Sequence, residues 1–227
     1  MTPAAFLTLT AGALLLLASS QARASIEAGE GAAALPAFAL DNITDKAETV
    51  FNVITEQPAE TDMDTAQNNV NAFLYCIRRA EGTAGAADPY RVCFAYKHTI
   101  GDLSQHPAIS GEWRGERLSD AMCANAGFGP GCVSTAAGAY QIIKPTWRNV
   151  AGKLGLTDFG PASQDAACIE LIRSRGALED VKAGRFEIAV NKCRNEWASL
   201  PGNYAKQGQR SLTDLVAWYQ QNGGTFA

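Results

Sequence analysis

The strongest constraint on the fold is an amphipathic segment that ends in a carboxylate and a glycine, within NAFLYCIRRAEGTAG at 71–85 of this 227-residue chain. Its apolar residues have the i, i+3, i+4, i+7 spacing of one buried helical face: Val70, Phe73, Leu74 and Ile77. Gly82 is a typical helix stop. The pattern therefore predicts a half-buried helix whose last turn holds Glu81, where the helix dipole disfavours negative charge.

Further helical patterns follow along the chain. Pro145 suits the first turn of a helix over 145–155. Ser163 is the expected N-cap of the next helix, which ends before Gly176. A third apolar stripe runs from Phe186 and stops at Pro201, and a fourth begins with a capping box at Ser211. With an irregular, strand-containing part between 88 and 140, we predict an α+β domain that is mostly helical with a small β element.

The N-terminal quarter differs in composition from the rest. Residues 1–24 combine an apolar run of signal-peptide length with a small-x-small site at Ala22–Ala24. No Lys or Arg precedes that run, so an uncleaved membrane anchor is the alternative. Residues 25–64 hold nine acids against one base, and we expect a flexible acidic linker over 25–66. The expected domains are thus a signal peptide, this linker, and a catalytic domain over 67–227.

Charge and cysteine content narrow the class of protein. Residues 65–227 hold 17 Lys and Arg against 14 Asp and Glu, a net charge of +3. This suits an anionic partner but is too weak, without a basic stripe, to indicate nucleic acid. The chain has six cysteines and no C-x-x-C pair. We expect three disulfides formed after export, with Cys123–Cys132 as the clearest pair; the alternative is small buried thiols in a reducing compartment.

The residues exclude several chemistries. Two dispersed histidines and no H-E-x-x-H argue against a metal site, and G-x-S-x-G is absent. What remains is carboxylate and amide chemistry. Glu81 is the first candidate, and Tyr140 with Gln141 in STAAGAYQII offers an aromatic face and an amide that suit a sugar. By residue pattern alone, a buried Tyr and a turn-capping Gln are the favoured explanation of the second motif.

Residues from about 70 to 224 resemble the lambda-type phage endolysins, lytic transglycosylases of the lysozyme superfamily. The matching pieces occur in the family's order: AEGT (80–83), GDLSQHP (101–107), STAAGAYQ (134–141), LGLTDFGPASQDA (154–166) and RGALEDVKAGRFEIAVNKCRNEWASLPG (175–202). The resemblance implies a lysozyme-like fold and covers about two-thirds of the chain. Residues 108–133 are longer than in the family, and most of the cysteines have no counterpart there.

The resemblance also implies roles for individual residues. Glu81 becomes the catalytic acid, and Tyr140 and Gln141 become substrate-binding residues beside the cleft. Tyr204 matches a cleft tyrosine more loosely. Four carboxylates lie in the predicted β region, where some lysozymes keep a second one: Asp102, Glu112, Glu116 and Asp120. The resembled family has no dedicated second carboxylate, and we place Asp102 with the substrate-binding residues. No cofactor or metal is implied.

The implied activity is cleavage of the MurNAc–GlcNAc β-1,4 bond of peptidoglycan with formation of 1,6-anhydro ends. A hydrolytic muramidase on the same fold, and a non-catalytic wall-binding module, are the alternatives. We expect a monomer that is exported to the periplasm or beyond. Its partner is the glycan strand, not nucleic acid, and it meets a membrane only through an uncleaved N-terminal segment.

Overall fold

The computed structural model describes residues 60–203 and 208–227. Pro58–Ala227 forms one compact unit. The predicted signal peptide or anchor, and the linker up to residue 59, lie outside the described residues, as does Tyr204. Within the described part, no helix is both long and apolar enough to cross a membrane.

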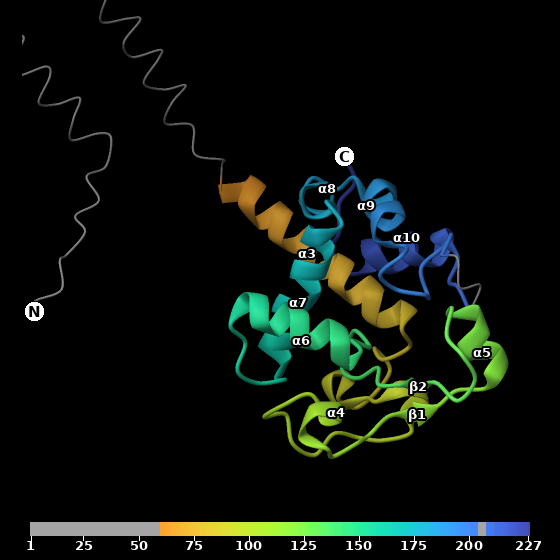
Figure 1. Cartoon of the computed structure of the whole chain (residues 1–227). Coiled ribbons are helices and arrows are strands. Elements are labelled where there is room, and N and C mark those ends of the chain that lie inside the picture. The colour runs from red at the N-terminus through yellow and green to blue at the C-terminus, as the bar shows by residue number, and fades with distance from the viewer. Residues whose placement is uncertain (1–59, 204–207) are drawn as a thin grey trace, which may run out of the picture. The chain divides into compact units, whose positions relative to one another are not determined.

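The helix predicted from the sequence lies at the centre of this unit. It is α3 (Glu60–Ala80), and it contacts α7 (Pro161–Ser174), α8 (Leu178–Lys182) and α10 (Leu212–Gln221) (Figure 1). All four residues of the predicted apolar face are buried. The apolar residues of α3 are thus covered by neighbouring helices, and this packing removes their surface from water.

The predicted linker boundary at 66 is wrong, because residues 60–66 already form the first turns of α3. Glu60, Asp62 and Asp64 lie there. Negative charges near a helix N-terminus are stabilised by the helix dipole. The acidic composition that indicated a linker therefore also suits the start of a helix.

The other helices follow the predictions with two corrections. α6 spans Lys144–Leu154 and α10 is capped by Ser211, whose hydroxyl accepts the Asp214 N–H at 3.0 Å. Ser163 does not cap α7; its hydroxyl donates to Asp158 at 2.9 Å, and Gly160 holds the N-cap position. The stripe expected to reach Pro201 ends earlier, because α9 covers Phe186–Cys193.

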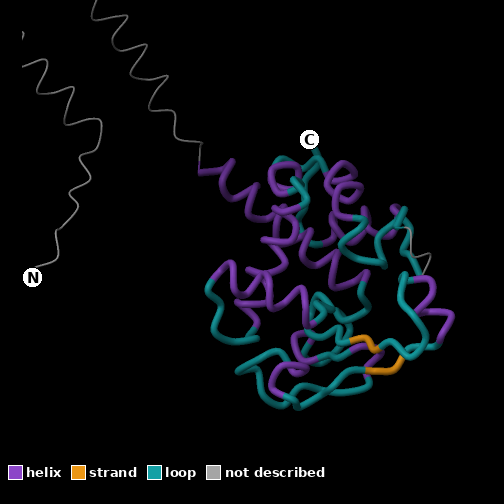
Figure 2. The backbone as a smooth tube through the Cα atoms, viewed as in Figure 1, coloured by secondary structure: helices purple, strands orange, loops and turns teal. Residues whose placement is uncertain are grey.

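The part between 88 and 143 is built from short elements, which lie at the end of the unit away from α8 and α9 (Figures 1 and 2). β1 (Glu116–Arg117) and β2 (Val133–Ser134) form an antiparallel pair with Glu116 opposite Ser134, so the mostly helical α+β prediction is confirmed. In chain order the elements are η1 (Pro89–Arg91), η2 (Phe94–Tyr96), α4 (Pro107–Ser110), β1 (Glu116–Arg117), α5 (Asp120–Asn125) and β2 (Val133–Ser134).

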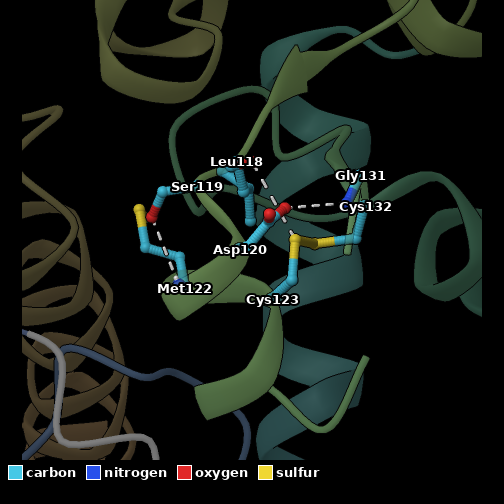
Figure 3. Close-up of a disulfide and its surroundings, with 7 residues drawn as sticks. All are labelled: Leu118, Ser119, Asp120, Met122, Cys123, Gly131 and Cys132. Atoms are coloured by element: carbon cyan, nitrogen blue, oxygen red, sulfur yellow. Dashed lines mark hydrogen bonds between the residues drawn. A yellow bond between two sulfur atoms is a disulfide. The ribbon is translucent and has the colours of Figure 1, made fainter. Parts of the chain in front are cut away.

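The predicted Cys123–Cys132 disulfide is present, with Cα atoms 5.8 Å apart. It closes the loop that joins α5 to β2, and Asp120 accepts the Gly131 N–H across this loop at 3.2 Å (Figure 3). The expectation of three disulfides is wrong. The remaining four cysteines are free and buried, where they fill core positions as small apolar groups: Cys76, Cys93, Cys168 and Cys193.

Candidate active site

Glu81 lies in the turn that closes α3. Its N–H continues the helix by donating to Ile77 O at 2.8 Å. Gly82 follows with φ +77°, its N–H bonds Arg79 O at 3.2 Å, and the Thr83 N–H bonds Arg78 O at 3.0 Å. This pair of bonds around a left-handed residue is a Schellman motif. It fixes the direction in which the Glu81 side chain leaves the helix, and it explains why a glycine follows.

The Glu81 carboxyl is held by a residue far along the chain. Ser199 Oγ donates to Glu81 Oε1 at 2.6 Å. Desolvation raises the pKa of Glu81 from 4.5 to about 7, against the Ser199 hydrogen bond and the positive charge of Arg210, which both lower it. Burial costs the anion more than these two groups return. Glu81 can therefore hold a proton near neutral pH and release it to a bound group.

The Gly138–Gln141 turn lies directly against the Glu81 turn. Thr83 Oγ1 donates to Ala139 O at 2.6 Å, which joins the two turns. Gln141 has φ +50°, an uncommon conformation for a residue with a side chain. Its amide Nε2 donates to Val92 O and Gly138 O, both at 3.0 Å. The amide thus stabilises a strained turn, a feature that is concentrated at functional sites.

A buried amide on α7 holds the same turn from behind. Gln164 Oε1 accepts the Ala139 N–H at 2.8 Å, and Nε2 donates to Phe159 O at 2.7 Å and Tyr90 O at 3.0 Å. A Cβ at Gly138 would lie 2.1 Å from Gln164 Oε1. Glycine is therefore required here, because the turn approaches the buried amide too closely for any side chain.

Tyr140 is fully buried, and its hydroxyl points into a polar network. It donates to Asp165 Oδ1 at 2.5 Å and accepts from Arg78 at 3.2 Å. Tyr90 is in the same network, donating to Asp165 at 3.0 Å. Burial is the main reason that the pKa of Tyr140 is raised far above its usual value. The contacts of Tyr140 thus stabilise the turn beside Glu81, and its hydroxyl is already occupied by protein partners.

Tyr96 is an exposed aromatic residue beside the Glu81 turn. Its side chain is 59% exposed, and its hydroxyl donates to Gly82 O at 2.6 Å. Tyr96 and its neighbour Ala95 have φ of +58° and +51°. Two consecutive non-glycine residues in this region cost roughly 1–2 kcal/mol each. The chain accepts this strain to place an aromatic ring next to the candidate acid.

Asp102 lies elsewhere and serves its own turn. Its carboxylate accepts the backbone N–H and the hydroxyl of Ser104, each at 2.8 Å, and these bonds lower its pKa. Among the described residues, no hydrogen bond joins Asp102 to the Glu81 turn or to the Gly138–Gln141 turn. In the same range, no group of three or more His, Cys, Asp or Glu residues is arranged to hold a metal ion.

Three residues of this site were not predicted from the sequence: Tyr96, Gln164 and Ser199. Ser199 lies 118 positions from Glu81, so no local pattern connects them. Gln164 belongs to the SQDA stretch that carries the family resemblance, which was the available signal for it. For Tyr96 the sequence offered no signal, because positive φ at a tyrosine is not encoded by local propensity.

Comparison with known proteins identifies relatives of this arrangement. The Endolysin family model matches residues 71–226. The endolysin of Escherichia phage P2 is 38% identical over 159 residues, covering 70% of this chain and 95% of the relative. The endolysin of Escherichia phage lambda is 41% identical over 163 residues, covering 70% and 93%.

Solved structures agree with these sequence matches. Bacteriophage lambda lysozyme in complex with a chitohexasaccharide has a TM-score of 0.59 and 32% identity, covering 70% of this chain and 97% of that one. A second structure of lambda lysozyme has a TM-score of 0.56 and 30% identity. The predicted lysozyme-like fold is therefore confirmed, and the chain belongs to the endolysin family of lysozyme-like enzymes.

Proposed function

We propose that this protein is a lytic transglycosylase that cuts the β-1,4 bond between MurNAc and GlcNAc in peptidoglycan. The observation that carries the proposal is the Glu81 carboxyl, which is desolvated at a helix end and has a pKa of about 7. Glycosidic cleavage needs an acid that is still protonated near neutral pH. Membership of the endolysin family supports a cell-wall substrate, and the chitohexasaccharide bound by lambda lysozyme supports a glycan as the substrate.

In the proposed reaction, protonated Glu81 donates its proton to the bridging oxygen as the bond from that oxygen to C1 of MurNAc breaks. The 6-hydroxyl oxygen of the same MurNAc forms a new bond to C1. The Glu81 carboxylate then takes the proton of that hydroxyl, which restores the acid. One leaving strand and one 1,6-anhydro end result, and no water is consumed.

The surroundings of Glu81 suit these two proton transfers. Ser199 donates to Oε1, which stabilises the anion during the short time it exists. The exposed ring of Tyr96 suits stacking against a sugar. Tyr140 and Gln141, predicted as substrate-binding residues, contribute by shaping the wall of the site. Tyr204 is proposed as a further cleft residue.

A second carboxylate at a set separation is the requirement of most hydrolytic glycosidases. Asp102 and Glu112 are the carboxylates of the β region with lowered pKa values. Both accept backbone N–H groups of their own loop, so their carboxylates stabilise the loop. This favours substrate-assisted chemistry over the muramidase alternative.

The test is product analysis. Purified peptidoglycan is digested with the protein, and the fragments are examined by mass spectrometry. Anhydro ends, lighter by one water than reducing ends, are expected. Reducing ends alone would show a muramidase. An intact polymer, with purified and folded protein, would show a non-catalytic module.

We further propose that the protein acts in the periplasm or outside the cell after export through its N-terminal segment. Endolysin relatives act on cell walls, and the Cys123–Cys132 disulfide suits an oxidising compartment. Fractionation of expressing cells, with the mass of the mature protein, tests this. Cytosolic protein of full mass would contradict it.

A further inference from the structure

A pocket of about 250 Å³ lies on the face of the Glu81 turn that is next to α10. We propose that this pocket binds a carboxylate of the peptide that peptidoglycan carries on its muramic acid residues, an inference that rests on the proposed function. The pocket lining is basic and aromatic, and it consists of Arg79, Gly82, Ala84, Gly85, Arg210 and Trp218. Of these residues, only Arg210 acts on the Glu81 carboxyl, whose pKa its charge lowers.

The two arginines of the pocket are not among the basic residues that pair with carboxylates in the described part of the chain. Such pairs do form elsewhere in the domain; Asp180, for example, accepts from both Arg185 and Lys192. Within residues 60–203 and 208–227, neither Arg79 nor Arg210 forms an ion pair. Two guanidinium groups at one pocket, with no carboxylate between them, favour an anionic ligand.

Both arginines are held in place by contacts that use little of their hydrogen-bonding capacity. The guanidinium of Arg79 lies over the Trp218 ring, 4.8 Å from the centroid. Such a contact orients the group through the ring face. Arg210 Nε donates to Ala80 O at 3.4 Å, a long bond, and its backbone N–H donates to Ser199 O at 2.9 Å. A guanidinium has five N–H donors, so both can bind a carboxylate.

The pocket is adjacent to the chemistry. Gly82 lines it and directly follows Glu81. The Arg210 N–H donates to the backbone oxygen of Ser199, and the Ser199 hydroxyl contacts the Glu81 carboxyl. The pocket is therefore lined by the residue that follows the candidate acid and by an arginine whose charge acts on it.

The substrate has an anion at the required place. Neutral N-acetylated sugars form the glycan, and the acidic peptide is attached through the lactyl ether on C3 of muramic acid. Each extended peptide residue spans about 3.3–3.6 Å, so the first acidic residues of the peptide can reach a pocket one residue away from Glu81. The net charge of +3 over residues 65–227 agrees with an anionic substrate. Two of the positive charges of this region, on Arg79 and Arg210, lie at this pocket.

The test assays two arginine variants on two forms of the substrate. Arg79→Gln removes a pocket charge, and Arg148→Gln removes an exposed charge on α6 as the matched control. Each variant is assayed on glycan strands that keep their peptides and on strands stripped of peptides by an amidase. We expect Arg79→Gln to lower kcat/KM about threefold on peptide-bearing strands, the size of an exposed ion pair, with no change on stripped strands. Arg148→Gln should change neither.

An equal loss on both substrates, or no loss on either, would overturn the pocket assignment while leaving the proposed function intact. If the unmodified protein cuts neither substrate, the proposed function fails, and binding decides the pocket separately. Titration with the free stem tripeptide, followed by NMR shifts of the Trp218 indole, should show saturable binding that Arg79→Gln weakens and that amidation of the peptide carboxyls abolishes. The absence of such shifts would refute the pocket.

Discussion

Glu81 and Glu112 both lie in turns, and the two turns treat a negative charge in opposite ways. Glu81 ends a helix, accepts one hydroxyl, and is desolvated, so its pKa rises to about 7. Glu112 accepts the Gly101 and Asp102 N–H groups and lies 2.7 Å from His98, and these donors lower its pKa. The same side chain thus becomes a proton donor in one loop and a structural anion in the other. The environment decides the role, as it does wherever carboxyl groups divide acid and base duties.

The largest difference between the two loops is expected in the rate of wall lysis when each carboxylate is replaced by an amide. Glu81→Gln removes the proton donor, and we expect the rate of wall lysis to fall by about 10²–10⁴-fold, the usual contribution of a general acid. Glu112→Gln keeps the donor at 81 and should remain within about twofold of the parent. Turbidity decrease of a cell-wall suspension measures both. Comparable losses in the two variants would mean that Glu81 has no special role.

The same two variants should differ in the sign of their pH-dependent stability. The pKa of Glu81 is about 7 in the folded state against 4.5 as the ordinary value, so the parent loses stability as pH rises from 4.5 through 7. Glu81→Gln does not ionise, and well above pH 7 it should be more stable than the parent by roughly 3 kcal/mol, at 1.36 kcal/mol for each of about 2.5 pKa units.

Glu112 has the opposite linkage. Its lowered pKa stabilises the folded state above pH 4.5, and that stability disappears as pH falls. Glu112→Gln should therefore be less stable than the parent at pH 7 and should approach it in acid. Urea unfolding of the three proteins at pH 4, 6 and 8 measures both trends. Parallel curves for both variants would show that the two loops do not differ as described.

The smallest expected effect comes from the hydroxyl that moderates Glu81. Ser199→Ala removes a hydrogen bond that lowers the Glu81 pKa, so the alkaline limb of the pH–activity profile should move upward by about one pH unit. Ser174→Ala, which removes an exposed hydroxyl on α7, is the matched control. A reduced rate with an unmoved profile would assign Ser199 to packing alone.

Much of the helical framework could be predicted because its signals are local. The apolar spacing on α3, the proline in the first turn of α6 and the Ser211 cap each act within a few residues. The errors are also local in origin. The acidic residues before Asn69 indicated a linker, although they also suit the start of a helix. Ser163 is of a residue type common at N-caps, but its hydroxyl donates to Asp158 instead.

The site was predicted less completely, because it is assembled from distant segments. The resemblance named Glu81, Tyr140 and Gln141, and the structure brings their two turns together through the Thr83–Ala139 hydrogen bond. The resemblance could not show that the Tyr140 hydroxyl is hydrogen-bonded by Asp165 and Arg78. Four cysteines counted toward disulfides are buried thiols. An even number of cysteines does not by itself imply pairing, because a disulfide also needs a specific geometry in space.

By itself, the sequence determined the helices, the glycine that ends α3, and the carboxylate placed just before that glycine. These are consequences of backbone sterics and of the 3.6-residue period, which act over short stretches. Tertiary structure alone decided that this carboxylate meets Ser199, loses its water, and lies within the influence of the Arg210 charge. Desolvation and charge depend on every group within a few ångströms, and those groups are separated by more than a hundred residues of chain.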